Sequence, residues 1–392
     1  MEPTALCARG SPLMDFEHTT EQIELRRTLR EFAQSEIRPH VMEWDEAQTF
    51  PLDVIKLLGR MGILGIVFPE DLGGAGMGYV DYAIAIEELA RVDPSVALIV
   101  AAHVSLCTNH IYQHGNDEQR RNYVPKLASG DWIGCWSITE PEAGSDAAGT
   151  RTMAKLEDGR WILNGSKTFT TNAQKADVCV AMAVTDPGEH HYGISAFVIE
   201  KGTAGFEVGR KENKLGMRAS DTGEVLFRDC AIPEKNLLGK RGEGFIGAMK
   251  ILDGGRISIA ALSVGIAQGA YEAALSYSKQ RQQFGKPIAE FQAIRHKLAD
   301  MATEIEASRL LTYQAGALAD QGKPVTRASA MAKLFASETA VRVANEAVQV
   351  HGGYGFIKDY PVEKFYRDAK LMTIGEGTSE VQRLVISREI LR

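Results

Sequence analysis

Cysteine is scarce in this chain of 392 residues, and the five cysteines form no recognisable ligand or disulfide pattern. They are odd in number, include no Cys-x-x-Cys pair, and are scattered at Cys7, Cys107, Cys135, Cys179 and Cys230. This spacing fits neither a zinc site nor a disulfide framework. We therefore expect free thiols in a reducing compartment. That compartment would be the bacterial cytoplasm, or the mitochondrial matrix in a eukaryote, although no clear transit peptide is present.

Long hydrophobic runs and an excess of positive charge are also missing. The most apolar window, Val96 to Leu106, contains His103 and is far shorter than the roughly 20 residues that a membrane span needs. The net charge of −7 opposes broad nucleic-acid binding, which requires many Lys and Arg side chains facing phosphates. Residues 1–13 contain prolines and no apolar signal core, so we expect a disordered leader outside the fold. We expect neither a membrane nor a nucleic acid as a partner.

The common catalytic signatures are absent as well. The chain has no His-Glu-x-x-His motif, no Gly-x-Ser-x-Gly motif and no complete P-loop. His110 and His114 are four residues apart and could share one face of a helix, but no third ligand is close in sequence. The glycine-rich stretch from Leu72 to Gly78 lacks the spacing of a dinucleotide-binding turn. We therefore expect no metal site and no Rossmann phosphate turn.

Hydrophobic periodicity divides the rest of the chain into three segments. Residues 14–130 carry apolar side chains at helical spacing, whereas residues 131–238 change to a period of two, as in 178–184, which predicts half-buried strands. Residues 239–392 return to helical spacing, with apolar steps of 3 and 4 between 291 and 305. The fold class is therefore expected to be mainly α with a central antiparallel β-domain, followed by a bundle of long helices.

Local signals add three expectations. Asn164-Gly165 predicts a tight turn at the end of a strand. Ser379 and Gln382 have the spacing of a capping box that would open the last helix. Gly352 follows a helix and would be an ordinary C-cap.

The segment from Trp136 to Asp146 is the first candidate site. Aromatic and β-branched residues run into hydroxyl residues and then into a loop with Pro and Gly. An ordinary turn that leaves a sheet explains this pattern, and composition alone favours that explanation. Alternatively, the segment is a ledge that presents hydroxyl and backbone N–H groups to a planar polar ligand beside an aromatic wall.

The second candidate is Glu376, which lies between Gly375 and Gly377. It is either a solvated residue of a linker or a carboxylate removed from water, whose raised pKa would make it a better base. The two glycines fit a flexible linker, and they would equally permit the close approach of a ligand to the backbone. The residues alone therefore leave both alternatives open. Arg281 to Lys286 and Gln349 to Gly353 each end a helix and are weaker candidates, the first for phosphate binding.

Four separated stretches, in this order, resemble the acyl-CoA dehydrogenase family along the chain from Met14. They are Ile138-Thr139-Glu140-Pro141 with Ala143–Asp146, Arg281–Lys286, Gln349–Gly355 and Glu376–Arg383. Leu252-Asp253-Gly254-Gly255-Arg256-Ile257 is similar to the short-chain, butyryl-type branch. The resemblance implies an N-terminal helical domain, a middle β-domain and a C-terminal four-helix bundle, usually assembled as a homotetramer.

The resemblance also implies FAD as the cofactor. Trp136, Ile138 and Thr139 would line the flavin, and an aromatic at position 169 would pack on its other side, although the family usually has Trp where this chain has Phe. The pyrophosphate and adenosine side would be held partly across a subunit boundary. The full set expected to contact FAD is Trp136, Ile138, Thr139, Ser145, Phe169, Thr170, Thr171, Arg281, Phe284, Gln292, Gln349, Gly352, Gly353, Thr378 and Glu380.

The substrate implied is a short- or medium-chain acyl-CoA. Ser145, Asp253, Arg256 and Gly377 would meet the CoA thioester, and Glu376 would take the α-proton while hydride leaves Cβ for the flavin. The product would be the trans-2-enoyl-CoA, with electrons passing to an electron-transferring flavoprotein. The short- and medium-chain enzymes commonly have an aromatic where this chain has glycine at 375, which removes one wall of the acyl pocket.

Two alternatives remain from the sequence. One is an acyl-CoA oxidase or a nitroalkane-oxidase-like flavoenzyme that uses oxygen. The other is a flavin-bearing relative without turnover that binds DNA or protein, which should lack the carboxylate and carry a basic face. Glu376 and the net charge of −7 oppose the second.

Overall fold

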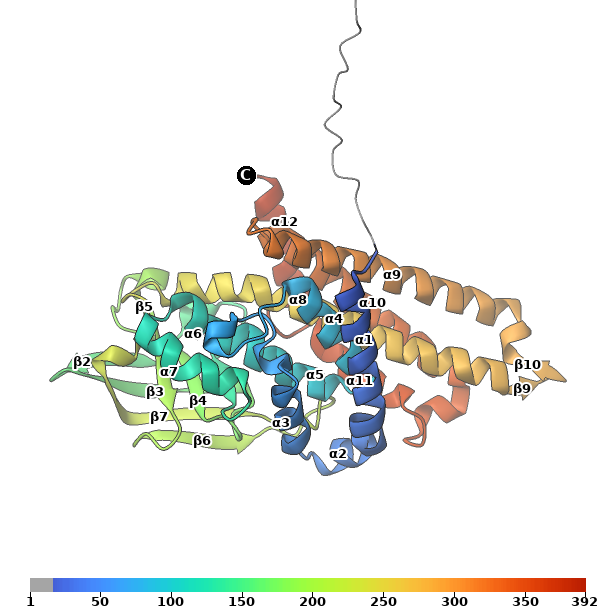
Figure 1. Ribbon diagram of the computed structural model, residues 1–392, viewed down its shortest axis with the longest axis horizontal. Coiled ribbons are helices and arrows are strands. Elements are labelled where there is room, and N and C mark those ends of the chain that lie inside the picture. The colour runs from blue at the N-terminus through green and yellow to red at the C-terminus, as the bar shows by residue number, and fades with distance from the viewer. Residues whose placement is uncertain (1–16) are drawn as a thin grey trace, which may run out of the picture.

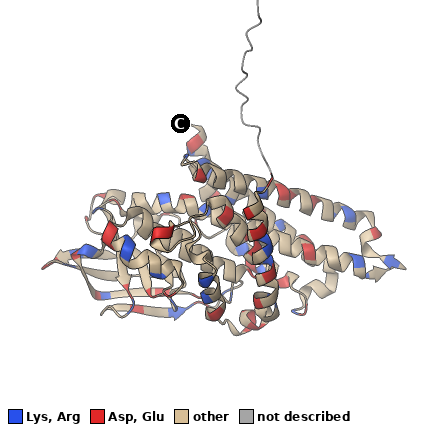
Figure 2. Cartoon of the chain, viewed as in Figure 1, with Lys and Arg blue, Asp and Glu red and all other residues tan. Residues whose placement is uncertain are grey.

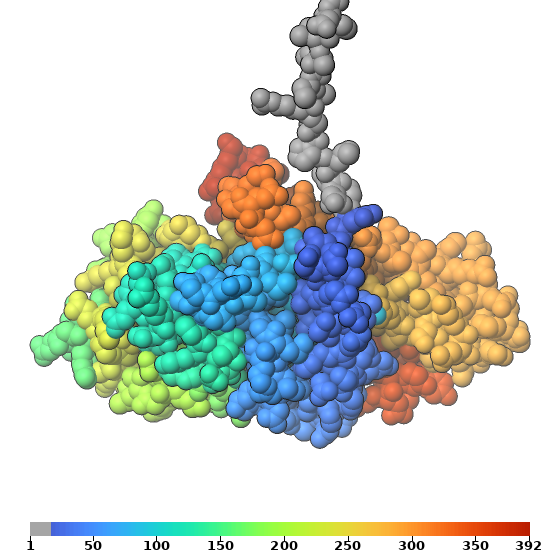
Figure 3. Space-filling model, in the orientation of Figure 1, coloured from blue at the N-terminus to red at the C-terminus, as the bar shows by residue number. Residues whose placement is uncertain are grey.

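Helices form the first part of the chain. The computed structural model describes residues 17–392, so the expected leader, residues 1–13, lies outside the described residues. The helices are α1 (Thr20–Phe32), α2 (Val41–Ala47), α3 (Leu52–Arg60), α4 (Tyr79–Ala90), α5 (Pro94–Ala101), α6 (Asn109–His114) and α7 (Asp117–Ala128). In the space-filling view, α1 runs down the middle of one face, between the other N-terminal helices on one side and the long C-terminal helices on the other (Figure 3).

A single continuous helix joins α5 to α6 through the π-helical turns of Ala102–Thr108. Within the described residues it is the one helix long and apolar enough to cross a membrane by length and composition, with a mean hydropathy of 1.3. However, 94% of its most apolar window is buried inside the molecule. Polar side chains are buried in this helix as well, both within the apolar window of the sequence, as at His103, and beyond it, as at His110.

Eight strands form the sheet of the middle part. They are β1 (Gly134–Ser137), β2 (Met153–Glu157), β3 (Arg160–Thr171), β4 (Val178–Val184), β5 (Ile194–Glu200), β6 (Phe206–Lys211), β7 (Thr222–Pro233) and β8 (Leu237–Leu238). Their order is β6-β7-β3-β2-β4-β5-β8, with β1 beside β4. The pairings are antiparallel except for β1 with β4 and β2 with β4, which are parallel.

Strand β4 is buried on both faces, whereas a half-buried strand was expected. Val178, Val180 and Met182 face the core shared with the helices. The alternate residues Cys179 and Ala181 face a second core on the other side of the sheet. Two cores therefore cover the sheet, because successive side chains of a strand point to opposite faces.

The tight turn expected at Asn164-Gly165 is wrong. Strand β3 continues for 12 residues, and the pairing with β7 shifts register between Leu163 and Gly165, which is a β-bulge. Gly165 has φ of 149°, and a Cβ there would come within 2.5 Å of the Thr152 hydroxyl oxygen. Pairing with β2 on one side and β7 on the other overrides the local preference for a turn.

Long helices form the last part. They are α8 (Gly244–Gln280), α9 (Gln292–Asp320), α10 (Thr326–His351), α11 (Val362–Met372) and α12 (Ser379–Ile390), with a short hairpin of β9 (Gln282–Gln283) and β10 (Lys286–Pro287) after α8. At 37 residues, α8 is about 55 Å long. It extends from the side of the sheet to the hairpin at the opposite end of the molecule (Figure 1). The C-cap expected at Gly352 is confirmed, with φ of 60°.

Candidate active site

Glu376 lies in the turn between α11 and α12, in a left-handed conformation with φ of 53°, and Gly377 follows with φ of 90°. This region of backbone space is strained for a glutamate. Three hydrogen bonds hold the turn. The Lys333 ammonium donates to the carbonyl oxygen of Gly377 at 2.6 Å, and the Gln382 amide donates to the carbonyls of Glu376 at 3.1 Å and Gly377 at 2.9 Å.

The capping box expected between Ser379 and Gln382 is wrong. Thr378 is the N-cap of α12, and its hydroxyl accepts from the Val381 backbone N–H at 3.3 Å. The Gln382 amide is already bonded to the two carbonyls of the turn. Because Gln382 is fully buried, its amide must find partners inside the molecule, and the turn supplies them.

The carboxyl group of Glu376 lies against α8. A Cβ at position 255 would come within 2.3 Å of Glu376 Oε2, so Gly255 leaves the space that this oxygen occupies. The residue as a whole is partly exposed, but Oε2 is buried and has no hydrogen-bond partner among residues 17–392. Burial raises the pKa of Glu376 to about 7, opposed by Lys333 and Arg256. This is the geometry of a carboxyl removed from water, not of a solvated linker.

Two of the residues expected at the thioester, Asp253 and Arg256, lie on α8 beside this carboxyl. Arg256 is 5% exposed and donates to Asp253 at 2.5 Å. The other oxygen of Asp253 accepts from the Thr326 hydroxyl at 2.6 Å. Ser145 is exposed in the loop after β1, and no bond within the described residues joins it to Arg256. The structure therefore groups the expected substrate residues around Glu376, except for Ser145.

The expected ledge forms where the ends of β1 and β3 lie side by side. The hydroxyls of Ser137 and Thr170 share a hydrogen bond of 2.8 Å, and the Thr139 carbonyl accepts from the Thr168 N–H at 2.9 Å. Phe169 interrupts β3 in a left-handed conformation with φ of 55°, and its ring is 65% exposed. Ile138, Thr139 and Thr171 are partly exposed. The Ser137 and Thr170 hydroxyls are buried, so the accessible groups here are the Phe169 ring and the partly exposed Thr139 and Thr171.

No motif in the sequence indicated the ion pair that stabilises this ledge. Lys167 lies fully buried on β3, with its ammonium 2.7 Å from a carboxylate oxygen of Glu140 in the loop after β1. Glu140 also accepts from the Thr150 hydroxyl and from the backbone N–H of Thr152. Burial favours the neutral acid, but Lys167 and these hydrogen bonds outweigh it and lower the pKa of Glu140 to about 2.

Trp136 is anchored to the long helix of the N-terminal part. Its indole N–H donates to His110 Nδ1 at 2.9 Å, so the proton of the neutral imidazole is on Nε2. Burial lowers the pKa of His110 to about 3. A protonated Nε2 cannot bind a metal together with His114, and residues 17–392 contain no group of three His, Cys, Asp or Glu side chains that could hold one.

The remaining residues expected to contact FAD lie at the other end of α8. Arg281 lies 5.2 Å from the centroid of the Tyr354 ring, which brings the hairpin and the end of α10 together. Phe284 has φ of 51° and is 92% exposed. Gln292 and Gln349 are exposed, and a Cβ at Gly352 or Gly353 would meet nothing within 4 Å. Within one chain, these residues therefore lie near one another and far from the ledge (Figure 1).

Thr378 and Glu380 open α12 directly after the turn. The Thr378 hydroxyl is occupied by the helix cap, and Glu380 is exposed. Gly375 precedes Glu376, and a Cβ there would meet only Leu371, at 3.7 Å, which is ordinary contact. The space that a side chain at 375 would fill is therefore open.

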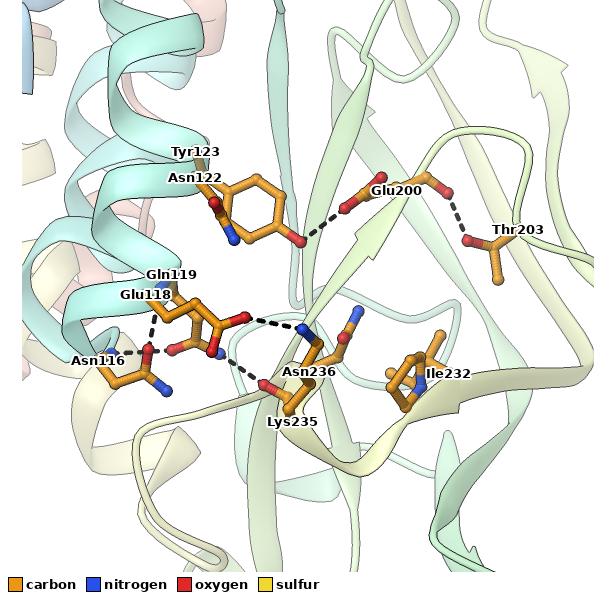
Figure 4. Close-up of a pocket in the computed structure, with 11 residues that line it drawn as sticks. Asn116, Glu118, Gln119, Asn122, Tyr123, Glu200, Thr203, Ile232, Lys235 and Asn236 are labelled. Atoms are coloured by element: carbon orange, nitrogen blue, oxygen red, sulfur yellow. Dashed lines mark hydrogen bonds and ion pairs between the residues drawn. The ribbon is translucent and has the colours of Figure 1, made fainter.

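A cavity of about 290 Å³ lies elsewhere, between α7 and the strands of the sheet (Figure 4). Its side chains mostly bond one another: Tyr123 donates to Glu200 at 2.8 Å, and Lys235 donates to Glu118 at 2.8 Å. Gln119 donates to the backbone carbonyl of Lys235 at 3.0 Å. These bonds tie α7 to the β-domain, so the cavity belongs to a structural contact.

Comparison with known families gives one match for each part of the chain. The model "Acyl-CoA dehydrogenase, N-terminal domain" matches residues 19–131, the middle-domain model matches 135–230, and the C-terminal-domain model matches 242–391. The chain belongs to the acyl-CoA dehydrogenase family. Its fold and its activity as an acyl-CoA dehydrogenase, an oxidoreductase with FAD as cofactor, follow from this membership.

Individual relatives of this acyl-CoA dehydrogenase cover almost its whole length. The short-chain specific acyl-CoA dehydrogenase of Clostridium acetobutylicum is 48% identical over 97% of this chain and 100% of its own. The butyryl-CoA dehydrogenase structure from Megasphaera elsdenii matches with a TM-score of 0.95 and 44% identity, over 97% of this chain and 100% of that one. A chain solved in work on the electron transferring flavoprotein of Acidaminococcus fermentans matches with a TM-score of 0.96 and 47% identity, over the same shares.

The residues of this acyl-CoA dehydrogenase fit an FAD at the ledge. The exposed ring of Phe169 and the partly exposed Thr139 and Thr171 are accessible where β1 and β3 end, whereas the hydroxyls of Ser137 and Thr170 are buried and bond each other. At the other end of α8, an exposed phenylalanine and two glycines with open space in front of them form a second surface. Phe284, which is 92% exposed, is accessible to a ligand or to another subunit.

Proposed function

We propose that the protein converts short- or medium-chain acyl-CoA thioesters to trans-2-enoyl-CoA, with Glu376 removing the α-proton. The single observation that carries this proposal is the buried and unpartnered Oε2 of Glu376, in a carboxyl whose pKa burial raises to about 7. A base with a pKa near the working pH transfers protons most effectively. Nothing within the described residues competes for that oxygen, so it is available to the substrate.

Bound FAD would supply the hydride acceptor, and the protein residues would orient the thioester and stabilise charge. We expect the thioester carbonyl to accept from the Glu376 backbone N–H, a donor without a partner among residues 17–392. Preorganised donors of this kind stabilise the enolate charge that forms as the α-proton leaves. Glycine on both sides of Glu376 lets the substrate approach the backbone closely.

The chain length proposed rests on the relatives and on the open space at Gly375. The Clostridium relative is named short-chain specific, and the Megasphaera structure is a butyryl-CoA dehydrogenase. Because a side chain is missing next to the base, we expect simple branched acyl groups to be accepted as well. One buried methylene contributes about 1–3 kcal/mol, so the preference should be graded.

The physiological acceptor that we propose is an electron-transferring flavoprotein, supported by the similar chain solved in work on such a flavoprotein. Single-turnover bleaching of the FAD absorbance across a panel of acyl-CoA thioesters tests the proposed reaction. We expect the highest kcat/KM with short to medium chains; a maximum at about sixteen carbons would contradict the chain length proposed. Mixing the reduced, product-bound protein with air separates a dehydrogenase, which reacts slowly with oxygen, from an oxidase.

A further inference from the structure

The described residues include three lysines with fully buried or nearly fully buried side chains: Lys167, Lys333 and Lys364. A buried ammonium is costly unless it is paired with a carboxylate. Lys167 lies 2.7 Å from Glu140, and Lys364 pairs with two aspartates at 2.8 and 2.7 Å. Lys333, by contrast, has no carboxylate oxygen within 4.0 Å in residues 17–392. Its burial therefore has no purely structural compensation of the kind that the other two have.

Lys333 points from α10 at the turn that carries Glu376. Its ammonium donates to the Gly377 carbonyl at 2.6 Å, and the Gln382 amide from α12 donates to the same oxygen at 2.9 Å. These bonds fix the peptide planes that follow Glu376, whose left-handed φ of 53° would otherwise relax. They thereby hold the side chain of Glu376 toward Gly255.

The charges that act on Glu376 come from two helices. Arg256 on α8 is 2.5 Å from Asp253, so a nearer carboxylate already compensates its charge. Lys333 on α10 is the larger of the two influences that favour ionised Glu376. Glu376 is in turn the largest charge influence on Lys333, ahead of Arg256 and the exposed Glu380.

One uncharged titratable group also faces this region. Tyr82 on α4 is fully buried, and burial raises its pKa well above the physiological range, so it remains neutral. Lys333 is therefore the cation beside Glu376 whose charge no closer carboxylate compensates.

We infer that Lys333 is a positioning residue for the base: it holds the turn through the Gly377 carbonyl and supplies the positive charge against which Glu376 ionises. The inference rests on the proposed function for the role of Glu376 as the base. Burial raises the pKa of Glu376 to about 7 even with Lys333 present, so loss of that charge raises it further. Burial lowers the pKa of Lys333 to about 8, and Glu376 opposes this shift.

The test measures the pH profile of kcat/KM on FAD-loaded protein. Lys333→Met keeps the length of the side chain but removes the charge and the donor. We expect it to move the acid limb to higher pH by about one unit, a tenfold loss of activity at a fixed pH on that limb. Lys333→Arg keeps the charge and should keep the limb near its wild-type position.

Two control variants separate this role from a structural one. Gln382→Met removes a donor to the same turn without changing charge, so it should lower kcat and leave the limb in place. Lys364→Met leaves two buried aspartates without their cation, so it should lower the temperature of unfolding and leave the limb in place. Below pH 7, where Glu376 is protonated, Lys333→Met should unfold near the wild-type temperature, because no buried carboxylate within hydrogen-bonding distance loses its partner.

A thermal-unfolding cycle of Lys333→Met and Glu376→Gln provides a readout that does not depend on activity. At a pH above 7, where Glu376 is ionised, we expect the effects of the two substitutions to be non-additive, because each removes the charge that the other faces. An unshifted acid limb in Lys333→Met, an equal shift in Lys333→Arg, or additive effects in the cycle would overturn the inference. If none of the acyl-CoA thioesters bleaches the FAD of the wild-type protein, the proposed function fails. The unfolding cycle still decides whether Lys333 is coupled to Glu376.

Discussion

Glu376 has a strained backbone conformation, and its Oε2 has no hydrogen-bond partner in residues 17–392. Its replacement should therefore lower the rate of flavin reduction more than the affinity for substrate or FAD. Glu376→Gln keeps the volume but leaves no carboxylate to take a proton. We expect flavin reduction in stopped-flow to fall by at least the roughly 10² to 10⁴-fold that a positioned base contributes. Glu376→Asp should be intermediate, because the shorter side chain misplaces the acid by about one methylene.

Two other glutamates serve as controls for that measurement. Glu142 in the ledge loop and Glu380 at the start of α12 are both exposed. Glu142→Gln and Glu380→Gln should reduce their flavin much faster than Glu376→Gln. The base would be misassigned if Glu376→Gln kept a near-normal rate while one of the other two lost it.

The raised pKa of Glu376 also predicts how the stability of the protein depends on pH. Folded protein binds this proton up to a pH of about 7, whereas the unfolded chain loses it near pH 4.5, the ordinary pKa of a glutamate. The stabilising contribution is therefore full below 4.5 and is lost as the pH rises through 7. Glu376→Gln cannot ionise, so above that pH it should exceed the wild type in unfolding free energy, by up to about 3 kcal/mol. Thermal unfolding at acid and alkaline pH measures the difference, which should vanish at acid pH.

Gly255 gives a second prediction at the scale of one residue. A methyl group there would come within 2.3 Å of Glu376 Oε2, so Gly255→Ala must displace the carboxyl group or the helix. We expect a large loss of flavin reduction, although alanine is the better helix former by about 1 kcal/mol. Gly254→Ala is the matched control, because its nearest contact would be the Tyr79 hydroxyl at 3.2 Å, which can move by a few tenths of an ångström. Equal activity of the two variants would show that the Glu376 carboxyl group does not depend on the space left by Gly255.

At the scale of elements, the order of helices, strands and helices could be predicted from periodicity, because it depends on which face of each element is apolar. The turn at Asn164-Gly165 and the capping box at Ser379 were wrong for one shared reason. In both cases another partner competes with the expected local pattern: β7 pairs with β3 through the bulge, and the Gln382 amide binds the carbonyls of Glu376 and Gly377 just before the helix.

The candidate site was predictable only in part, because groups far away in the chain complete it. Motifs within one stretch of sequence pointed to Glu376 and to the ledge. The groups that hold Glu376 in place, Lys333 and Gly255, come from helices more than forty residues away in the chain, and no local pattern links them to it. Lys167 likewise meets Glu140 only because β3 returns beside β1.

The ion pair of Lys167 and Glu140 should decide the stability of the ledge. Lys167→Met leaves Glu140 buried and without its cation, which typically costs about 3–5 kcal/mol. We expect a matching fall in the unfolding free energy by chemical denaturation and weaker retention of FAD. Lys155→Met on the neighbouring strand β2 is the control: its side chain is exposed, and the change should remain within about 0.5 kcal/mol. Similar values for both variants would mean that the pair contributes little.

At the scale of the whole molecule, charges of both signs are mixed in the view of Figure 2. Lys and Arg alternate with Asp and Glu over the helices and the sheet, and the view shows no extended basic face (Figure 2). This mixture of charges agrees with the net charge of −7 and gives no support to the alternative that the protein is a flavin-bearing relative that binds DNA. The two groups of residues expected to contact FAD are far apart within one chain, because they lie at opposite ends of α8 (Figure 1).

That separation leads to the prediction for assembly. Near the start of α8, a Cβ at Gly247 would lie 3.5 Å from His110 Nε2, and His110 holds Trp136 of the ledge. Arg281 follows the last residue of α8, 34 residues further on, which is about 50 Å along the helix axis. One cofactor cannot span that distance within a chain. We therefore propose that Arg281 contacts FAD bound to a neighbouring subunit of a homotetramer.

Arg281→Ala should then reduce two properties together, the FAD retained per chain and the fraction of tetramer. The guanidinium would lose its position over Tyr354 as well as its contact with the cofactor, so both the cofactor and the interface are affected. Light scattering gives the assembly state, and absorbance after gel filtration gives the ratio of FAD to protein. Lys279→Ala, an exposed residue two positions earlier on the same helix, should change neither. A wild-type monomer that is fully active and loaded with FAD would contradict the shared site. A variant that kept both FAD and tetramer would show that Arg281 serves neither.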